Sequence, residues 1–207
     1  MNPYDYTDKQ LAPVRESLIR LFGKLKTAKS ESLLDLIKRI YKELKSKVDK
    51  MYLKIVRYYY KKNGGTDLDQ FDDEWLYEFL VEFDPVTGYQ FSNEWERKLY
   101  RQYEAIEARK KAKQSASEPI RRSRVLLNNQ ITQKAIEATD TGVLTAYKDQ
   151  GIKWVRWNVM DDKACDDCLE RDGKVFDINK VSKLHPNCRC WFTPVREDQK
   201  TQKVRED

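Results

Sequence analysis

Apolar side chains recur every three or four residues through the first third of the chain, a spacing that predicts helices. The first helix is expected over residues 8–27, and its apolar stripe consists of Leu11, Val14, Leu18, Leu21 and Leu25. A longer stripe then advances by alternating steps of three and four residues, a heptad pattern typical of coiled coils. Its members are Leu34, Ile37, Tyr41, Leu44, Val48, Met51, Ile55 and Tyr58, and it stops at Asn63-Gly64-Gly65. The two stripes predict an antiparallel helical hairpin, with pairing between chains as the alternative.

The starts of both helices carry polar residues that resemble a capping box, in which side chains bond the free backbone N–H groups of a first turn. The two pairs are Thr7 with Gln10 and Ser32 with Asp35. The tyrosines of the long stripe, Tyr41 and Tyr58, are expected to pack in a core or groove rather than to stack on nucleic-acid bases.

Two further helices are expected before a polar break in the chain. The first has its apolar face at Trp75, Leu76, Phe79, Leu80 and Phe83. It ends before Pro85, because proline disfavours helix in the preceding residue. After a turn over residues 84–89 and a cap at Ser92 or Asn93, the second helix carries Trp95, Leu99, Tyr103 and Ile106. Residues 114–119 are small and polar, so a domain boundary is expected there.

The remaining pattern predicts a small mixed domain. A helix over residues 124–150, with a bend or break at 139–142, is followed by an alternating strand over residues 152–159. Asp172-Gly173 is a hairpin turn signal, and short strands are expected at residues 174–176 and from Cys190 onward. The sequence therefore predicts a mainly α fold. It comprises an elongated helical arm domain (1–113), a basic linker (114–123), an α+β domain (124–195) and a mobile charged tail (196–207).

All four cysteines and the single histidine lie within one stretch that reads C-D-D-C, then sixteen residues, then H-P-N-C-R-C. A C-x2-C pair holds two thiolates on one tight turn, and a second Cys/His group about twenty residues later completes a tetrahedral zinc site. Five candidates compete for four places. Beside Cys165 and Cys168, the other half is either His185 with Cys188 or Cys188 with Cys190. We expect a structural zinc in a zinc-ribbon-like site, with two disulfides or free thiols as the alternatives.

This stretch resembles the C-terminal signature of the tailed-phage minor head proteins, the head-morphogenesis family typified by the Mu F-like proteins. The shared string runs from Trp154-Val155-Arg156-Trp157 through C-x2-C and Asp172-Gly173-Lys174 to H-P-N-C-R-C, and the likeness extends over residues 120–195. Many relatives carry Arg-Thr-Glu in the upstream helix, where this chain has Ala138-Thr139-Asp140. The resemblance implies a few copies inside the capsid near the portal, and a role in assembly or in DNA packaging, retention and ejection.

Charge is distributed unevenly along a chain whose net charge is +6. Residues 20–62 hold fourteen basic and four acidic side chains, residues 66–84 hold eight acidic and no basic ones, and residues 97–124 hold ten basic and three acidic ones. Mutual neutralisation and a solvated linker are one interpretation. The other is a basic face that binds double-stranded DNA without sequence specificity. The candidate DNA-binding residues are Arg109, Lys110, Lys111, Lys113, Arg121, Arg122 and Arg124.

The sequence argues against catalysis and against a membrane. A single histidine excludes the paired-histidine sites of many hydrolases and nucleases, and neither a Walker A loop nor a dinucleotide-binding glycine motif occurs. A metal with four protein ligands leaves no open position for a reactive water. No run of eighteen apolar residues and no signal peptide occurs, so we expect synthesis in a bacterial cytoplasm.

Two functional hypotheses follow. The first is a non-catalytic minor head protein of the virion, bound at the portal vertex inside the capsid. Its partners would be the portal protein, the scaffold or major capsid protein, double-stranded DNA and other copies of the chain. In this hypothesis the N-terminal helices dock on the portal, and the acidic segment over residues 67–84 lies against part of the basic flank. The second hypothesis is a zinc-stabilised nucleic-acid-binding regulator with a helical oligomerisation arm.

Overall fold

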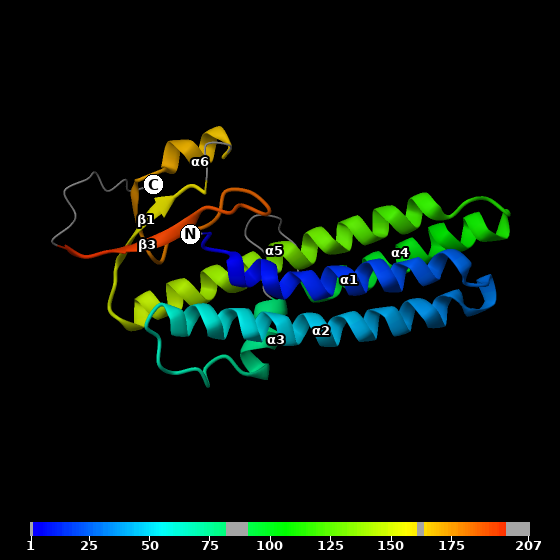
Figure 1. The fold of residues 1–207 in the computed structure, drawn as a ribbon, viewed down its shortest axis with the longest axis horizontal. Coiled ribbons are helices and arrows are strands. Elements are labelled where there is room, and N and C mark those ends of the chain that lie inside the picture. The colour runs from blue at the N-terminus through cyan, green and yellow to red at the C-terminus, as the bar shows by residue number, and fades with distance from the viewer. Residues whose placement is uncertain (1, 82–90, 161–163, 198–207) are drawn as a thin grey trace.

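Four long helices lie side by side in an elongated bundle, and a small sheet lies at one end (Figure 1). The computed structural model describes residues 2–81, 91–160 and 164–197, with the backbone alone for residues 91–100. The bundle consists of α1 (Asp5–Thr27), α2 (Leu33–Lys62), α4 (Phe91–Lys111) and α5 (Ser117–Asp149). The turn η1 (Ser30–Ser32) joins α1 to α2, and the short α3 (Asp73–Val81) follows α2. The mainly α fold predicted from the sequence is confirmed.

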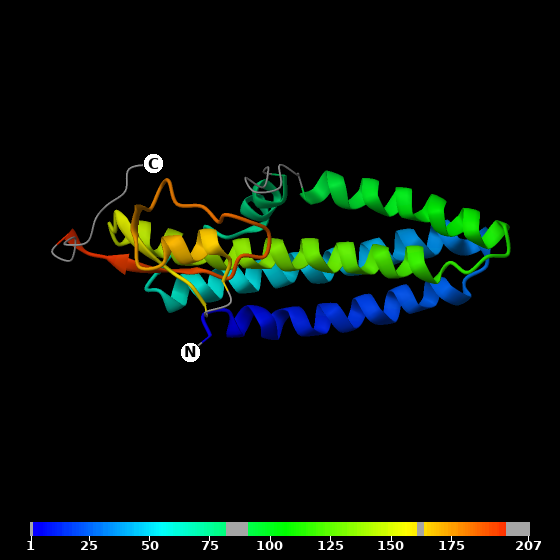
Figure 2. The ribbon, with the colours of Figure 1, turned by 90° about the horizontal axis from the view of Figure 1, so that it is seen from above.

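Helices α2 and α5 form the middle of the bundle, with α1 and α4 on either side, as Figure 2 shows. Along α2, five of the inner heptad positions are buried (Ile37, Leu44, Val48, Met51 and Ile55), whereas Tyr41 is half-buried and packs against their cluster. A neighbouring stripe of α2 is buried as well, because α5 covers the side that α1 leaves open; it contains Ile40, Tyr52, Val56 and Tyr59. The predicted hairpin of α1 and α2 is confirmed, and its apolar stripe is covered within one chain.

Both ends of the predicted heptad lie at the margin of the core. Leu34 is half-buried, and its neighbour Leu33 is the residue that enters the core. Tyr58 is 38% exposed and stacks on Tyr6 of α1, with the ring centroids 3.8 Å apart. A strict heptad repeat has a period of 3.5 residues and an α-helix has about 3.6 residues per turn. The stripe therefore follows the core along the centre of α2 and drifts away from it at the ends.

Helix α5 continues without interruption across residues 139–142, where the sequence predicts a bend or break. The predicted break therefore does not occur, and the small residues serve helix packing instead. At Gly142 the backbones of α5 and α2 approach closely, and a Cβ atom there would lie 2.5 Å from the carbonyl oxygen of Val56. Beside it, the hydroxyl oxygens of Thr139 and of Thr7 in α1 lie 2.6 Å apart.

The linker expected over residues 114–123 is largely helical, because α4 ends at Lys111 and α5 begins at Ser117. Ile120 and Leu127 of α5 belong to the same apolar cluster as the stripes of α1 and α2. Tyr147, near the other end of α5, belongs to the cluster beneath the sheet. One helix therefore joins both cores, and residues 117–123 do not separate them.

The sheet has three antiparallel strands, with β1 (Trp154–Asn158) between β2 (Val175–Asp177) and β3 (Trp191–Val195). Val155 and Trp157 alternate toward the buried side, as the sequence pattern predicts, and form one apolar cluster with Phe176, Phe192 and Tyr147. A short helix, α6 (Asp166–Arg171), connects β1 to β2. The turn signal at Asp172-Gly173 therefore ends a helix instead of joining two strands of a hairpin.

Neither predicted capping box forms. Helix α1 begins before Thr7, whose hydroxyl lies in the core and 3.3 Å from that of Tyr59. The Ser32 hydroxyl donates to the carbonyl of Lys29 instead of capping α2. The turn expected over residues 84–89 and most of the expected tail, residues 198–207, lie outside the described residues. Among the helices that the structure describes, none combines the length and apolar character of a membrane span.

Candidate metal centre

The C-x2-C pair is set by the first turn of α6. Cys165 is the extended residue that precedes this helix, and Cys168 is its third residue. The N–H of Leu169 donates to the carbonyl of Cys165 at 2.9 Å, which closes the turn. Asp166 and Asp167 occupy the first turn, where carboxylates are favoured by the positive end of the helix dipole. One helical turn therefore brings a buried and an exposed thiol to the same place.

The H-P-N-C sequence forms a tight turn that brings His185 and Cys188 together. The N–H of Cys188 donates to the carbonyl of His185 at 3.2 Å. Pro186 suits the second position of such a turn, and Asn187, with φ of 58°, suits a third position that requires positive φ. The N–H of Asn187 donates to the side-chain oxygen of Gln133 in α5. The turn is thus anchored on the helix that joins both cores.

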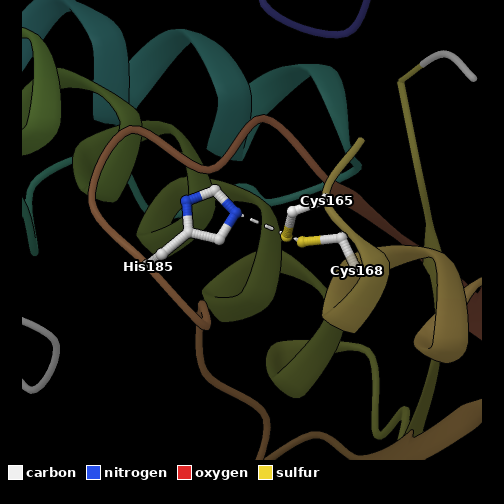
Figure 3. A group of neighbouring side chains, drawn as sticks. All are labelled: Cys165, Cys168 and His185. Carbon is white, nitrogen blue, oxygen red and sulfur yellow. Dashed lines mark hydrogen bonds between the residues drawn. The ribbon is translucent and has the colours of Figure 1, made fainter. Parts of the chain in front are cut away.

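The two halves of the motif meet around one sulfur atom (Figure 3). Nε2 of His185 lies 3.4 Å from Sγ of Cys168, and Sγ of Cys188 lies 3.6 Å from the same sulfur. Two overlapping groups could each hold a metal ion: Cys165, Cys168 and His185, and Cys168, Cys188 and Cys190. The structure therefore gathers all five predicted ligands and leaves open which four bind. None of the four cysteines forms a disulfide.

The thiols of the cluster differ in acidity. The pKa of Cys188 is lowered to about 5, chiefly because the Cys190 thiol donates a hydrogen bond to its sulfur, with a further contribution from the Lys183 ammonium. Burial raises the pKa of Cys168 to about 12. The thiolate is the form of cysteine that binds metals.

A buried polar network contacts the backbone of Cys190. The Lys183 ammonium contacts the Tyr4 hydroxyl at 2.9 Å, a carboxylate oxygen of Asp140 at 3.3 Å and the carbonyl of Cys190. The Tyr4 hydroxyl donates to the same Cys190 carbonyl at 2.8 Å. The side chains of Lys183 and Asp140 are 6% and 13% exposed. Burial raises the pKa of Asp140 to about 6, although the ammonium acts in the opposite direction.

A second ion pair ties the cluster to α1. Arg189, between the last two cysteines, donates to both carboxylate oxygens of Asp8. This hydrogen-bonded pairing lowers the pKa of Asp8. Sequence reasoning identified neither this pair nor the network around Lys183, since the Tyr4–Cys190 and Asp8–Arg189 contacts each join residues more than 180 positions apart. The only local signal in the sequence was Arg189, a charged residue between the candidate ligands Cys188 and Cys190.

The predicted DNA-binding residues gather at the opposite end of the bundle, where α4 ends and α5 begins (Figure 1). Several of them already have partners. Lys110 donates to the backbone carbonyls of Lys26 and Ala28. Glu118 accepts hydrogen bonds from Arg121 at 2.8 Å and from Arg122 at 2.7 Å. These two ion pairs reduce the free charge that the sequence assigns to this segment.

The acidic helix α3 lies beside the basic flank of α2, as the charges predict. A groove between the two helices is lined by Lys42, Lys45 and Lys50 of α2 and by Asp73 of α3. Coulomb attraction across this groove offsets part of the positive charge of α2.

Comparison of the chain with models of protein families, with curated proteins and with solved structures finds no match in any of the three. The resemblance to minor head proteins therefore rests on the motif string alone, and the function of the chain is a proposal.

Proposed function

We propose that this chain is a non-catalytic structural protein of a tailed-phage head, and that its Cys/His cluster holds one structural zinc ion. The spacing of the donor atoms supports zinc most directly. With Zn–S near 2.3 Å and Zn–N near 2.0 Å, tetrahedral ligands lie about 3.8 Å apart for two sulfurs and about 3.5 Å for sulfur and nitrogen. The corresponding separations here are 3.6 Å for Cys168 and Cys188, and 3.4 Å for Cys168 and His185.

The proposed zinc would join α6 to the H-P-N-C turn. Cys165, Cys168 and Cys188 are common to both combinations that the motif allows, and Cys168 and Cys188 are each 1% exposed. Either His185 or Cys190 would complete the tetrahedron. A sheet of three short strands has a small core of its own, and small domains are commonly stabilised by a metal whose binding energy appears as folding energy.

The chemistry of the ligand set supports a structural role over a catalytic one. Four protein ligands leave no position for a reactive water. The ligands are also embedded in contacts that serve packing, since the Cys190 carbonyl is held by Tyr4 and Lys183. No second histidine exists in the chain to act as a base beside the site.

The ordered string of tryptophan, C-x2-C, Asp-Gly-Lys and H-P-N-C-R-C motifs supports the assignment to a phage head. In this proposal the protein sits near the portal inside the capsid and contributes to assembly and to packaging, retention or ejection of DNA. The elongated bundle is the docking element. It exposes large apolar side chains on α1 and α5, among them Ile19 (58% exposed) and Leu126 (48% exposed).

Co-purification with the portal protein tests this assignment. Replacing Ile19 and Leu126 with Asp on the bundle should abolish co-purification and leave the metal content unchanged. The matched control is Leu169→Asp on α6, which is 41% exposed and lies at the metal end. If only the control loses the portal, the metal end is the docking element. If the chain is missing from purified virions and from their assembly intermediates, the assignment to the phage head is wrong.

A zinc-stabilised nucleic-acid-binding regulator is the second candidate. The basic residues at the free end of the bundle favour it. The genes that neighbour the gene for this protein distinguish the two candidate functions. Neighbouring portal and capsid genes support the head protein, whereas a regulatory operon supports the alternative.

A further inference from the structure

The end of the bundle away from the sheet concentrates positive charge from two distant parts of the sequence. Residues 20–39 surround the connection between α1 and α2, and residues 104–124 surround the connection between α4 and α5. Both connections lie at the same end of the molecule in Figures 1 and 2. Lys110 of α4 links the two connections, because its ammonium donates to the backbone carbonyls of Lys26 and Ala28. We call these two ranges together the basic tip.

The basic tip carries more net charge than the whole chain. It contains thirteen basic and five acidic residues, a net charge of +8, whereas the chain as a whole has +6. Its ion pairs leave a subset of cations available. Glu118 holds Arg121 and Arg122, Glu107 holds Lys111, and Arg20 is bound to Glu43 outside the tip. In the described structure no side-chain hydrogen bond or ion pair involves Lys24, Lys26, Lys29, Arg109 or Lys113.

Lys113 stands in a backbone conformation that lysine rarely adopts. Its φ is 58°, and the N–H groups of Lys113 and Gln114 bond back to α4, which is how a helix commonly ends. Glycine is the usual residue at this position, because a Cβ atom makes positive φ costly. The chain instead places an exposed cation there, between Arg109 and the start of α5. Strain of this kind marks a position where another requirement outweighs stability.

We propose that the basic tip binds the phosphate backbone of duplex DNA through Lys29, Arg109 and Lys113, with Lys24 and Lys26 beside them. Within residues 20–39 and 104–124 the only aromatic ring, Phe22, is buried. Single-stranded nucleic acid is usually held by stacking on exposed aromatic rings, so the tip suits a duplex. Lysine and arginine side chains that contact phosphates position a protein on DNA but do not recognise its sequence. The tip therefore suits binding without sequence preference. This inference rests on the proposed function, to which it adds a direct DNA contact. No residue of the metal centre takes part in that contact.

Glu118 sets the strength of this contact. It accepts hydrogen bonds from both Arg121 and Arg122 at the start of α5. This hydrogen bonding lowers the pKa of Glu118 to about 2, so the carboxylate is fully charged at neutral pH. Removing its charge would release two arginines at the edge of the tip. The structure therefore assigns Glu118 a restraining role in DNA binding.

Binding of the full-length chain to a fluorescent duplex oligonucleotide, measured by anisotropy across a salt series, tests the proposal. The tip variant replaces Lys29, Arg109 and Lys113 with Gln. Each phosphate contact contributes about 0.9 to the slope of log K against log salt. Removing three contacts should therefore lower the DNA affinity of the tip variant on the order of a hundredfold near 0.15 M salt. The matched control replaces Lys148, Lys153 and Lys180, exposed lysines near the sheet, with Gln and should change affinity less than threefold. An equal loss in both variants would show general charge attraction and overturn the proposal.

Two single substitutions separate DNA contact from folding. Glu118→Gln should tighten binding and steepen its salt dependence. Lys113→Gly should raise Tm, because it removes the strain, and should weaken DNA binding about fivefold, because it removes one contact. Unchanged binding by Lys113→Gly, or weaker binding by Glu118→Gln, would contradict the assignment. Loss of DNA binding in the tip variant with metal content unchanged would leave the proposed metal centre intact.

Discussion

Replacing Lys183 with Met should show how strongly the buried network holds the N-terminus against the metal centre. The ammonium contacts Asp140, Tyr4 and the Cys190 carbonyl. Its removal leaves the Asp140 carboxylate buried without a cation, and breaking a buried pair in this way costs about 3–5 kcal/mol. The double variant Asp140→Asn, Lys183→Met removes both charges and should recover most of that loss.

The loss should depend on pH, because the pKa of Asp140 is raised to about 6 in the folded protein and is about 3.9 in an unfolded chain. A raised pKa means that the carboxyl group stabilises the fold fully below about pH 4 and loses this contribution as pH rises through about 6. A difference of two pKa units corresponds to roughly 3 kcal/mol in the free energy of unfolding. Without Lys183 the pKa of Asp140 rises further, so Lys183→Met should be much more destabilising at pH 7 than at pH 5.

Urea unfolding followed by tryptophan fluorescence at both pH values measures this difference, with all variants at equal metal content. Lys180→Met, which changes an exposed lysine three residues away, is the control and should cost less than about 0.5 kcal/mol. If Lys183→Met lowers the free energy of unfolding equally at pH 5 and pH 7, or no more than the control does, the network does not hold the N-terminus.

Two further substitutions test the helix packing and the second contact to α1. Gly142→Ala places a Cβ atom 2.5 Å from the Val56 carbonyl oxygen and should cost about 1–3 kcal/mol in chemical denaturation. Gly23→Ala, with no atom within 4 Å of the new Cβ, should instead stabilise α1 by up to about 1 kcal/mol. Arg189→Ala removes the partly exposed pair with Asp8. It should cost about 1 kcal/mol or less and raise the pKa of Asp8 in an NMR titration.

The helices and the ligand cluster were accessible from sequence because their signals are local. The 3–4 spacing along α1 and α2 depends only on which side of one helix is buried. The C-x2-C and H-P-N-C strings place ligands on two turns, each formed by a few consecutive residues. The pairing of α2 with α5 was not accessible, because Val56 and Gly142 meet only in the folded chain. For the same reason the sequence predicts a bend at residues that provide close helix contact.

The surroundings of the candidate site were the least accessible part. Tyr4, Asp140 and Lys183 come from three distant segments, and each taken alone is an ordinary polar residue. Their joint burial beside Cys190 follows from the way α1 and α5 pack under the sheet. The choice among five ligands also stays open, because Cys168 is shared by both groups of donors.

Native mass spectrometry of the freshly purified full-length chain, without added reductant, tests the metal centre most directly. We expect one bound zinc per chain and four cysteines free of disulfides after the metal is removed. The variants Cys168→Ser and Cys188→Ser should lose the ion. A metal-free chain whose mass is lower by four hydrogens would mean that the cysteines form two disulfides, and the proposed zinc centre would then be wrong.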